Sequence, residues 1–220
     1  MGLDYDESPP ISQGWWTAGH VVLFPPFKWL TRLRVSGAAN IPATGPVLIV
    51  SNHISQIDPM VIGIAARSRR SHYMAKAELF RIPFVRWLIY NMGAFPVERG
   101  GADRRALRVA KEVLRRGDTL LMFPEGSRFT DGGLRPGLPG AGSLGLEDGV
   151  VVVPAAIWGS HRFLRRVKVV FGPPLDLTEI NGGSRASRSR AAVDRMMEEI
   201  ARLIPAAGGP PTDPPGHRDE

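Results

Sequence analysis

The polar side chains with the clearest chemical potential lie in the segment 51–59, which reads Ser-Asn-His-Ile-Ser-Gln-Ile-Asp-Pro. It follows the apolar run Val47 to Val50, so these groups stand at the carboxyl end of a predicted strand, where open α/β sheets assemble their sites. A carboxylate five residues after a histidine can orient the ring through one nitrogen and leave the other to take a proton from a hydroxyl group. His53 and Asp58 are therefore a candidate general base and its partner.

The same residues also have structural interpretations. Asp58 directly precedes Pro59, which is typical of a helix N-cap followed by proline at the first helical position. Asn52 can form an Asx turn, and His53 can be a hydrogen-bonded loop histidine. The His-Asp spacing is a weak signal by itself, because short motifs recur by chance.

Three further segments place polar groups or a proline near the ends of predicted strands. They are 93–101, which contains Arg99, then 124–128, and finally 150–156, which contains Val153 and Pro154. The structural alternatives are a solvated arginine, a tight turn, and a buried strand whose proline marks an edge or a bulge. Glu125 and Arg128 are the more specific candidates, because strand ends point into the shared crevice of such a sheet.

The sequence lacks the motifs that several other kinds of catalysis or binding require. The chain has no cysteine, which removes disulfides, thiolate metal sites and a cysteine nucleophile. The segment 141–145, Ala-Gly-Ser-Leu-Gly, departs from a nucleophile elbow at its first residue, and the glycines over 132–149 lack the Gly-Lys-Ser/Thr of a P-loop. We also find no spacing of histidine and acidic residues that predicts a metal site.

The candidate site residues are connected by short apolar runs that alternate with segments of helical pattern, and these strands and helices are expected to position them. The expected strands are 47–50, 71–75, 94–97, 119–123, 150–157 and 167–171, and the expected helices are 59–66, 80–92, 103–116, 140–146 and 187–204. This alternation predicts a single α/β domain with a mainly parallel central sheet flanked by helices.

Composition predicts how the rest of the chain is organised. Residues 1–12 are acidic and contain prolines, so we expect a loose N-terminus. Residues 13–34 are rich in aromatic side chains and end in Lys28, Arg32 and Arg34, which is typical of a membrane-interface helix. A helix that covers the core and is broken at Pro25 and Pro26 is an alternative of equal weight. The expected catalytic domain covers 35–204, and the Pro- and Gly-rich residues 205–220 are predicted to form a disordered tail.

The charge balance narrows the expected partners. The 220 residues include 28 Lys and Arg against 21 Asp and Glu, a formal net charge of +7, so the partner should be anionic. The basic clusters 67–70 and 162–168 lack an aromatic stacking motif, so no nucleic-acid partner is expected. No stretch is apolar enough to span a membrane, and the acidic first residues do not suit a secretory signal, which favours a cytoplasmic protein.

Taken in order, four blocks resemble those of the lysophospholipid and glycerol-phosphate acyltransferase family, of the 1-acylglycerol-3-phosphate acyltransferase type. They are Asn-His-Ile-Ser-Gln-Ile-Asp, Phe-Pro-Val-Glu-Arg, Phe-Pro-Glu-Gly-Ser-Arg and Val-Val-Pro, within about 35–174. The resemblance implies a membrane-associated α/β enzyme that moves an acyl chain from a thioester of coenzyme A or acyl carrier protein to a glycerolipid hydroxyl. By position, it implies His53 as general base with Asp58 as partner, and substrate binding by Arg99, Glu125, Gly126, Ser127, Arg128, Val153 and Pro154.

The resemblance also sets the expected reaction. Because a thioester is already activated, a histidine base worth about 10²–10⁴-fold is sufficient, without a protein nucleophile, metal or further cofactor. We expect lysophosphatidic acid as acceptor, phosphatidic acid as product, and a peripheral or monotopic protein on the cytoplasmic face of the cell membrane. Leu138 stands in a stretch where relatives often carry a basic residue, so glycerol 3-phosphate or a non-phosphate lipid is an alternative acceptor. A non-catalytic peripheral lipid-binding module, in which His53 and Asp58 are structural, is the alternative function.

Overall fold

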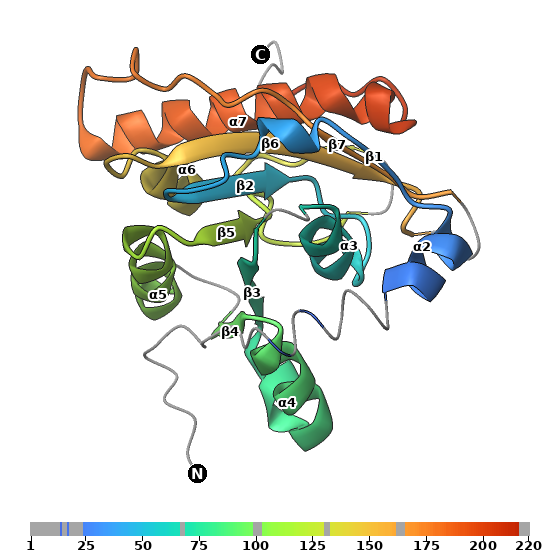
Figure 1. Cartoon of the computed structure of the whole chain (residues 1–220). Helices are drawn as coiled ribbons and strands as arrows, with labels where there is room; N and C mark the ends of the chain where they lie inside the picture. The colour runs from blue at the N-terminus through green and yellow to red at the C-terminus, as the bar shows by residue number, and fades with distance from the viewer. Residues whose placement is uncertain are drawn as a thin grey trace.

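The computed structural model describes residues 14, 17, 24–66, 69–98, 103–129, 133–161 and 166–215. These residues form an α/β domain built on a seven-stranded sheet (Figure 1). The strands are β1 (Arg34–Ser36), β2 (Val47–Ser51), β3 (Ser71–Lys76), β4 (Ala94–Val97), β5 (Thr119–Met122), β6 (Val151–Trp158) and β7 (Lys168–Phe171). Their order in space is β1-β7-β6-β2-β5-β3-β4.

Five neighbouring strands, β6, β2, β5, β3 and β4, run parallel to one another. β7 is antiparallel to β6, and β1 is parallel to β7. The prediction of a mainly parallel sheet is therefore confirmed. The carboxyl ends of the five parallel strands meet at one edge of the sheet, which we call the carboxyl edge, and this is where sites form in open α/β sheets.

Helices cover both faces of this sheet. The described helices are α2 (Phe24–Thr31), α3 (Asp58–Ala65), α4 (Pro83–Asn91), α5 (Arg104–Arg115), α6 (Pro139–Gly145) and α7 (Arg185–Ala207), with the short 3₁₀ helices η2 (Ala38–Asn40) and η3 (Ala77–Arg81). α5, α6 and α7 pack on one face and α3 packs on the other, and α7 lies along the top of the sheet in Figure 1. A Cβ at Gly142 would overlap the carbonyl oxygen of Ser189, so glycine is required for the close approach of α6 to α7.

β2 shows how the sequence builds a core on each face. Leu48 and Val50 belong to the cluster that contains α5, α6 and α7, whereas Val47 and Ile49 belong to the cluster that contains α3. All four side chains are fully buried, because helices cover both faces of the sheet and the strand therefore reads as a continuous apolar run. The residues that follow β2 emerge at the carboxyl edge in the middle of the sheet.

Two helices have boundaries that differ from the sequence prediction. The helix expected over 80–92 is divided into η3 and α4 at Ile82, whose extended backbone (φ −89°, ψ 112°) reflects the steric restriction imposed by the following Pro83. α7 continues to Ala207 instead of ending at Ile204, so residues 205–207 are helical and not part of a disordered tail. Gly208, with φ 94°, ends α7 in the left-handed conformation that favours glycine, and its N–H donates to the carbonyl of Ile204.

β1 is a strand that the sequence pattern did not predict. Its three residues are exposed and lie across the expected boundary between the segments 13–34 and 35–204. Arg34 of β1 lies beside Lys168 of β7. Pairing with a segment distant in sequence stabilises this strand, and no local periodicity could indicate it.

The described part of the N-terminal segment consists of α2 and the helical residues 14 and 17. The expected loose region 1–12 and most of the aromatic stretch before α2 lie outside the described residues. Pro25 and Pro26 lie in the first turn of α2, where a missing N–H removes no intrahelical hydrogen bond. Within the described ranges, no helix has both the length and the apolar character needed to cross a bilayer.

Candidate active site

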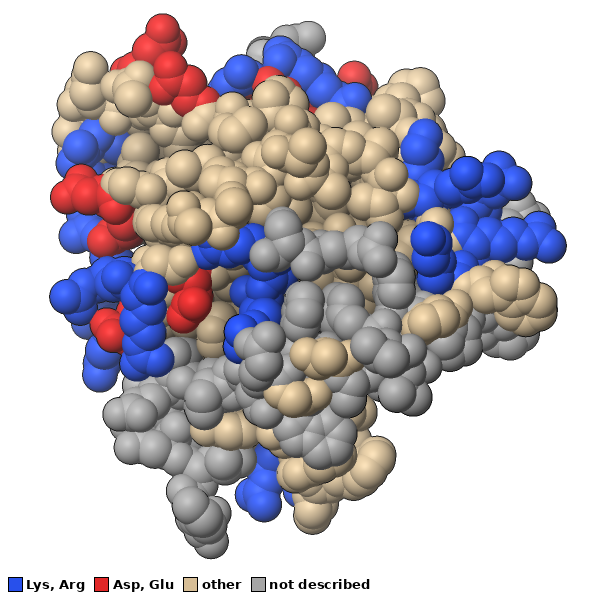
Figure 2. Space-filling view, in the orientation of Figure 1, with Lys and Arg blue, Asp and Glu red and all other residues tan. Residues whose placement is uncertain are grey.

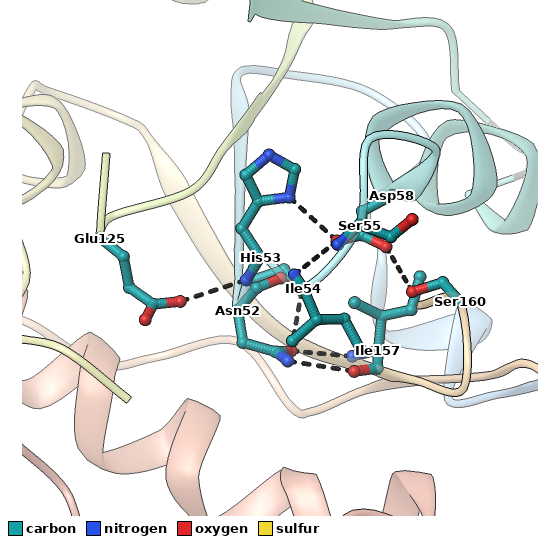
Figure 3. Close-up of polar contacts among 9 residues, drawn as sticks. Asn52, His53, Ile54, Ser55, Asp58, Glu125, Ile157 and Ser160 are labelled. Atoms are coloured by element: carbon teal, nitrogen blue, oxygen red, sulfur yellow. Dashed lines mark hydrogen bonds and ion pairs between the residues drawn. The ribbon is translucent and has the colours of Figure 1, made fainter. Parts of the chain in front are cut away.

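Three loops meet at the carboxyl edge near the middle of the sheet (Figure 3). Residues 52–57 follow β2, residues 123–129 follow β5, and residues 159–161 follow β6. Because β6, β2 and β5 are neighbouring parallel strands, their carboxyl ends are adjacent although the loops are far apart in the sequence. The structure therefore brings the first and third predicted motifs together.

His53 and Asp58 form a hydrogen-bonded pair in this region. Nδ1 of His53 lies 2.9 Å from Oδ2 of Asp58, whose side chain is completely buried. The second ring nitrogen points away from Asp58 in Figure 3, and the His53 side chain keeps 11% of its surface exposed. One imidazole nitrogen is thus held by the protein, and the other has no hydrogen-bond partner among the described residues, so a substrate could approach it.

Asp58 is surrounded by hydrogen-bond donors. Oδ2 also accepts from the backbone N–H groups of Ile54 and Ser55, each at 2.7 Å, and Oδ1 accepts from the hydroxyl of Ser160 at 2.6 Å. A carboxylate with only donors around it requires Nδ1 of His53 to carry the ring proton. In the neutral ring, Nε2 is then the nitrogen with the lone pair, and this is the tautomer that a general base needs.

The interpretation of Asp58 as a helix N-cap is wrong. Ile57 occupies the N-cap position of α3, and Asp58 is the first helical residue, with Pro59 next in the first turn. The chain between His53 and Asp58 turns tightly, with the N–H of Asp58 donating to the carbonyl of Ser55 at 3.3 Å. This turn directs the carboxylate back to residues 53–55 and across to Ser160.

The imidazole of His53 is held by its neighbours as well as by Asp58. The ring stacks on Phe123, with centroids 4.0 Å apart and planes inclined by 19°. The backbone N–H of His53 donates to Oε1 of Glu125 at 3.1 Å, and its carbonyl accepts from the N–H of Phe129 at 2.9 Å. Fixing the ring in this way reduces the entropy lost when the base reaches its reacting geometry.

Glu125 joins two segments of the site. Oε1 accepts from the N–H of His53, and Oε2 accepts from the N–H of Arg135 at 3.0 Å. The residue is buried, and both carboxylate oxygens are directed at the backbone. The geometry thus shows a positioning role for Glu125, while its expected part in acceptor binding stays a prediction.

The turn after Glu125 carries the remaining residues of the third motif. Gly126 has φ +66°, and a Cβ there would lie 2.6 Å from Cδ1 of Leu138, so this turn favours glycine. Ser127 is half-buried and Arg128 is exposed, which leaves a cation accessible on the loop that follows β5. Arg99, the predicted phosphate ligand of the second motif, lies outside the described residues.

Val153 and Pro154 of the fourth motif lie inside the sheet, five and four residues before the last residue of β6. They are buried and pair with Ile49 and Val50 of β2. β6 is an interior strand between β2 and β7, so Pro154 does not mark an edge of the sheet. It does lie at an irregularity of the ladder, in agreement with the bulge alternative, because Ala155 pairs with Phe171 but Val152 pairs with Leu175, which leaves one more residue in the partner segment than in β6 between these two pairs. Proline is tolerated there because β6 and β7 pair only from Ala155 onward, and the Pro154 carbonyl still accepts from the N–H of Gly172 at 2.8 Å.

Two residues hold the site in a way that the sequence did not predict. Asn52 does not form the expected Asx turn but bridges to β6: its Nδ2 donates to the Ile157 carbonyl at 3.0 Å, and its Oδ1 accepts from the Ile157 N–H at 2.9 Å. Ser160, which holds Asp58, follows β6 in a segment without a recognisable motif. The position of Asn52 directly before His53 was the only available signal for either residue.

This arrangement is suited to removing a proton from a bound hydroxyl group. The base and its orienting carboxylate are two of the three members of the triad found in acyl-transfer enzymes, and a rigid loop holds both of them in place. Arg128 adds an exposed cation on a neighbouring loop that an anionic substrate could reach.

Comparison with known proteins agrees with this chemistry. The family model described as "Acyltransferase" matches residues 32–158. The chain is 30% identical over 153 residues to a 1-acyl-sn-glycerol-3-phosphate acyltransferase of Borreliella burgdorferi, covering 68% of this chain and 60% of that protein. It is 35% identical over 145 residues to a lyso-ornithine lipid O-acyltransferase of Pseudomonas aeruginosa, covering 65% of this chain and 52% of that protein. The chain thus spans little more than half the length of these two relatives.

A solved structure also resembles this fold. It is the crystal structure of the 1-acyl-sn-glycerophosphate acyltransferase PlsC from Thermotoga maritima, with a TM-score of 0.63 and 28% sequence identity. The similarity covers 80% of this chain and 74% of the other.

Proposed function

The chain belongs to the acyltransferase family, and on this premise we propose that it transfers a fatty acyl chain from a thioester to the hydroxyl group of a lysophospholipid. The observation that carries the proposal is the pairing of His53 with the fully buried Asp58 at the carboxyl edge. The proposed acceptor is 1-acylglycerol 3-phosphate, and the product is phosphatidic acid. The relatives that are named 1-acyl-sn-glycerol-3-phosphate acyltransferases support this acceptor.

The reaction follows from the available ring nitrogen. Nε2 of His53 takes the proton from the acceptor hydroxyl as its oxygen attacks the thioester carbonyl carbon. The tetrahedral intermediate then collapses, the carbon–sulfur bond breaks, and the thiol leaves with the proton held by the imidazolium. Asp58 keeps the ring in the required tautomer and stabilises its charged form in both steps.

A phosphate on the acceptor would be held by arginine side chains. Arg128 follows a turn that Glu125 fixes to the backbone of His53, so its distance from the base is constrained. Together with Arg99, it would form charge-assisted hydrogen bonds that contribute about 1.5–3 kcal/mol each. Such contacts would set the distance between the phosphate and the attacking hydroxyl.

A non-phosphate acceptor is the second candidate within this family. Leu138, where a basic residue would add a phosphate contact, is 53% exposed and lies against Gly126 in the site loop. An aliphatic side chain at this place favours a less charged headgroup. The relative named lyso-ornithine lipid O-acyltransferase supports this alternative.

We place the reaction at an anionic membrane surface, with a thioester of coenzyme A or acyl carrier protein as co-substrate and no further cofactor. The supporting feature is an open pocket of about 440 Å³ whose lining includes Trp29 and the cations Lys28, Arg32, Arg34 and Arg166. Figure 2 shows basic side chains gathered around α2 at the right of the view. This chemistry suits a peripheral or monotopic protein on the cytoplasmic face of the cell membrane.

The proposal is tested by an acceptor panel. Purified protein is given a radiolabelled long-chain acyl thioester with lysophosphatidic acid, lyso-ornithine lipid or glycerol 3-phosphate, and the products are separated by lipid chromatography. We expect labelled phosphatidic acid, and its loss in the variant His53→Ala. Unchanged activity in that variant would exclude His53 as the base. Vesicle binding without consumption of thioester for any acceptor would instead support the non-catalytic lipid-binding module.

A further inference from the structure

A group of exposed apolar side chains lies on η3 and α4, outside the site described above. Leu79, Ile82, Phe84 and Trp87 are 41%, 52%, 70% and 45% exposed. The rings of Phe84 and Trp87 stack with centroids 6.1 Å apart. We call these four residues the α4 patch. Contiguous exposed apolar surface of this kind marks an interaction site.

Helix α4 packs on the described domain only in part, through the half-buried Ile89 on its inner face. None of its nine residues is buried, although most of them are apolar. A helix of this length is marginal in water, and surface helices of globular proteins normally gain stability by burying one face. On the outer face of α4, Phe84 and Trp87 nevertheless keep 70% and 45% of their surface exposed.

The α4 patch lies on the same edge of the sheet as the candidate active site. η3 directly follows the carboxyl end of β3, and β3 runs parallel to β5, which leads into the Glu125 loop. α2 is at this edge as well, because it precedes Arg34 of β1, which pairs with Lys168 beside Trp158 at the end of β6. In Figure 1, α3 lies between α2 and α4. The carboxyl edge thus carries the candidate base and two helices with exposed tryptophans.

The charges around the α4 patch favour an anionic surface. Lys76, Arg81 and Arg86 flank it, and Glu78, the acidic residue of this segment, pairs with Lys76 at 3.0 Å. On the face seen in Figure 2, the region over α4 shows uncharged and basic atoms. Aromatic side chains next to Arg and Lys are typical of the membrane interface.

We propose that the α4 patch inserts into one leaflet of an anionic bilayer and, together with α2, holds the carboxyl edge of the sheet against the membrane. Nine helical residues span about 14 Å, too short for a hydrocarbon core of about 30 Å, so α4 lies in the interface. The functional consequence rests on the proposed function: a lysophospholipid could reach His53 from the leaflet without leaving it completely.

The absence of cysteine from the sequence permits a direct test of insertion. Phe84→Cys introduces a single thiol on the α4 patch, and Arg108→Cys introduces one on the exposed face of α5 as a control. Each variant is labelled with an environment-sensitive fluorophore and mixed with phosphatidylcholine vesicles that contain one quarter phosphatidylglycerol. We expect a blue shift and quenching by lipids brominated in the acyl chain at position 84, and neither effect at position 108. No shift at position 84, or equal shifts at both positions, would overturn the proposal.

A second experiment measures what the patch contributes to binding. We expect the double variant Phe84→Ser/Trp87→Ser to partition into these vesicles at least about tenfold more weakly than the unchanged protein, because two aromatic side chains no longer enter the interface. The matched double variant Phe84→Leu/Trp87→Phe should retain binding. Circular dichroism checks that both variants are folded.

Two further measurements separate this proposal from other outcomes. With a water-soluble short-chain acceptor and thioester, the serine variant should keep its activity, since the α4 patch lies outside the catalytic pair. If the unchanged protein is inactive with every acceptor but position 84 still inserts, the proposed function fails and membrane insertion stands. If the serine substitutions change the mass measured by sedimentation without lipid and leave vesicle binding unchanged, the patch contacts a second copy of the chain and the proposal is wrong.

Discussion

Ser160 donates its hydroxyl hydrogen to Oδ1 of Asp58 at 2.6 Å, and both residues are buried. They are 102 positions apart in the chain, and the parallel pairing of β2 with β6 brings them together. The hydrogen bond ties the partner of the candidate base to a different strand. Asp58 is therefore held by the tertiary fold as well as by its own loop.

The first prediction concerns this hydrogen bond. Ser160→Ala should lower the free energy of unfolding by about 1.5–3 kcal/mol, as expected for a hydrogen bond to a charged group, and should lower kcat because Asp58 is less firmly positioned. Urea unfolding and steady-state kinetics measure the two effects. Ser189→Ala is the matched control, because within the described part of the chain the Ser189 hydroxyl donates to a carbonyl of its own helix, that of Arg185. A kcat equal to that of the control would contradict a positioning role for Ser160.

The second prediction concerns the action of His53 and Asp58 as a unit. Asp58→Asn should reduce kcat by about 10²–10⁴-fold, because an amide no longer fixes the productive tautomer or stabilises the imidazolium. Residues that act together are not additive, so the double variant His53→Ala/Asp58→Asn should be no slower than His53→Ala alone. Additive losses would show that Asp58 acts independently of the ring.

The third prediction separates positioning from acceptor binding at Glu125. In Glu125→Gln, the new NH₂ group would face the backbone N–H of either His53 or Arg135. One buried donor then loses its acceptor, and the free energy of unfolding should fall by about 1–3 kcal/mol. Glu78→Gln, at an exposed position, serves as the control. An unchanged unfolding free energy with a raised KM for the acceptor would assign Glu125 to substrate binding instead.

The fourth prediction concerns the acceptor headgroup. Leu138→Lys introduces a cation beside the site loop at a half-exposed position, where the charge can stay hydrated. We expect kcat/KM to rise by about tenfold for lysophosphatidic acid relative to lyso-ornithine lipid, with the gain reduced at high salt. Leu138→Gln, which is polar but uncharged, is the control. Equal changes for both acceptors would show that residue 138 does not face the headgroup.

The fifth prediction concerns stability against pH. His72 is buried, and desolvation lowers its pKa below 6.5, an effect that the charge of Asp118 opposes. The unfolded chain therefore binds a proton more readily than the native protein, so the free energy of unfolding should fall as the pH drops below about 7. In His72→Gln, this fall between pH 7.5 and pH 5 should be smaller. An equal fall in both proteins would assign the acid sensitivity to other groups.

Local patterns were sufficient for the core of the fold. The fully apolar run Val47 to Val50 predicted a strand, and β2 covers these residues and is buried throughout. Asp103 and Gly117 delimit the amphipathic segment of α5, and the structure shows Asp103 capping it through the N–H of Ala106. These signals come from residues that lie within a few positions of one another, so they can be recognised in a single sequence.

Where the prediction failed, the determining contact was distant in sequence. β1 depends on its pairing with β7, and Pro154 sits in an interior strand because of the strand order. The division of η3 from α4 at Pro83 was an exception, since that signal was local and was overlooked.

For this protein, the sequence alone determined which residues could perform the chemistry, because the ordered motifs containing His53 and Asp58 are local. The tertiary structure decided how they are held: Ser160 on Asp58, Glu125 on the backbone of His53, and Asn52 on β6. It also placed α2 and the α4 patch on the edge that carries the base. These relationships depend on the order in which parallel strands pair, and hydrophobic periodicity specifies which segments form strands but not which strands become neighbours.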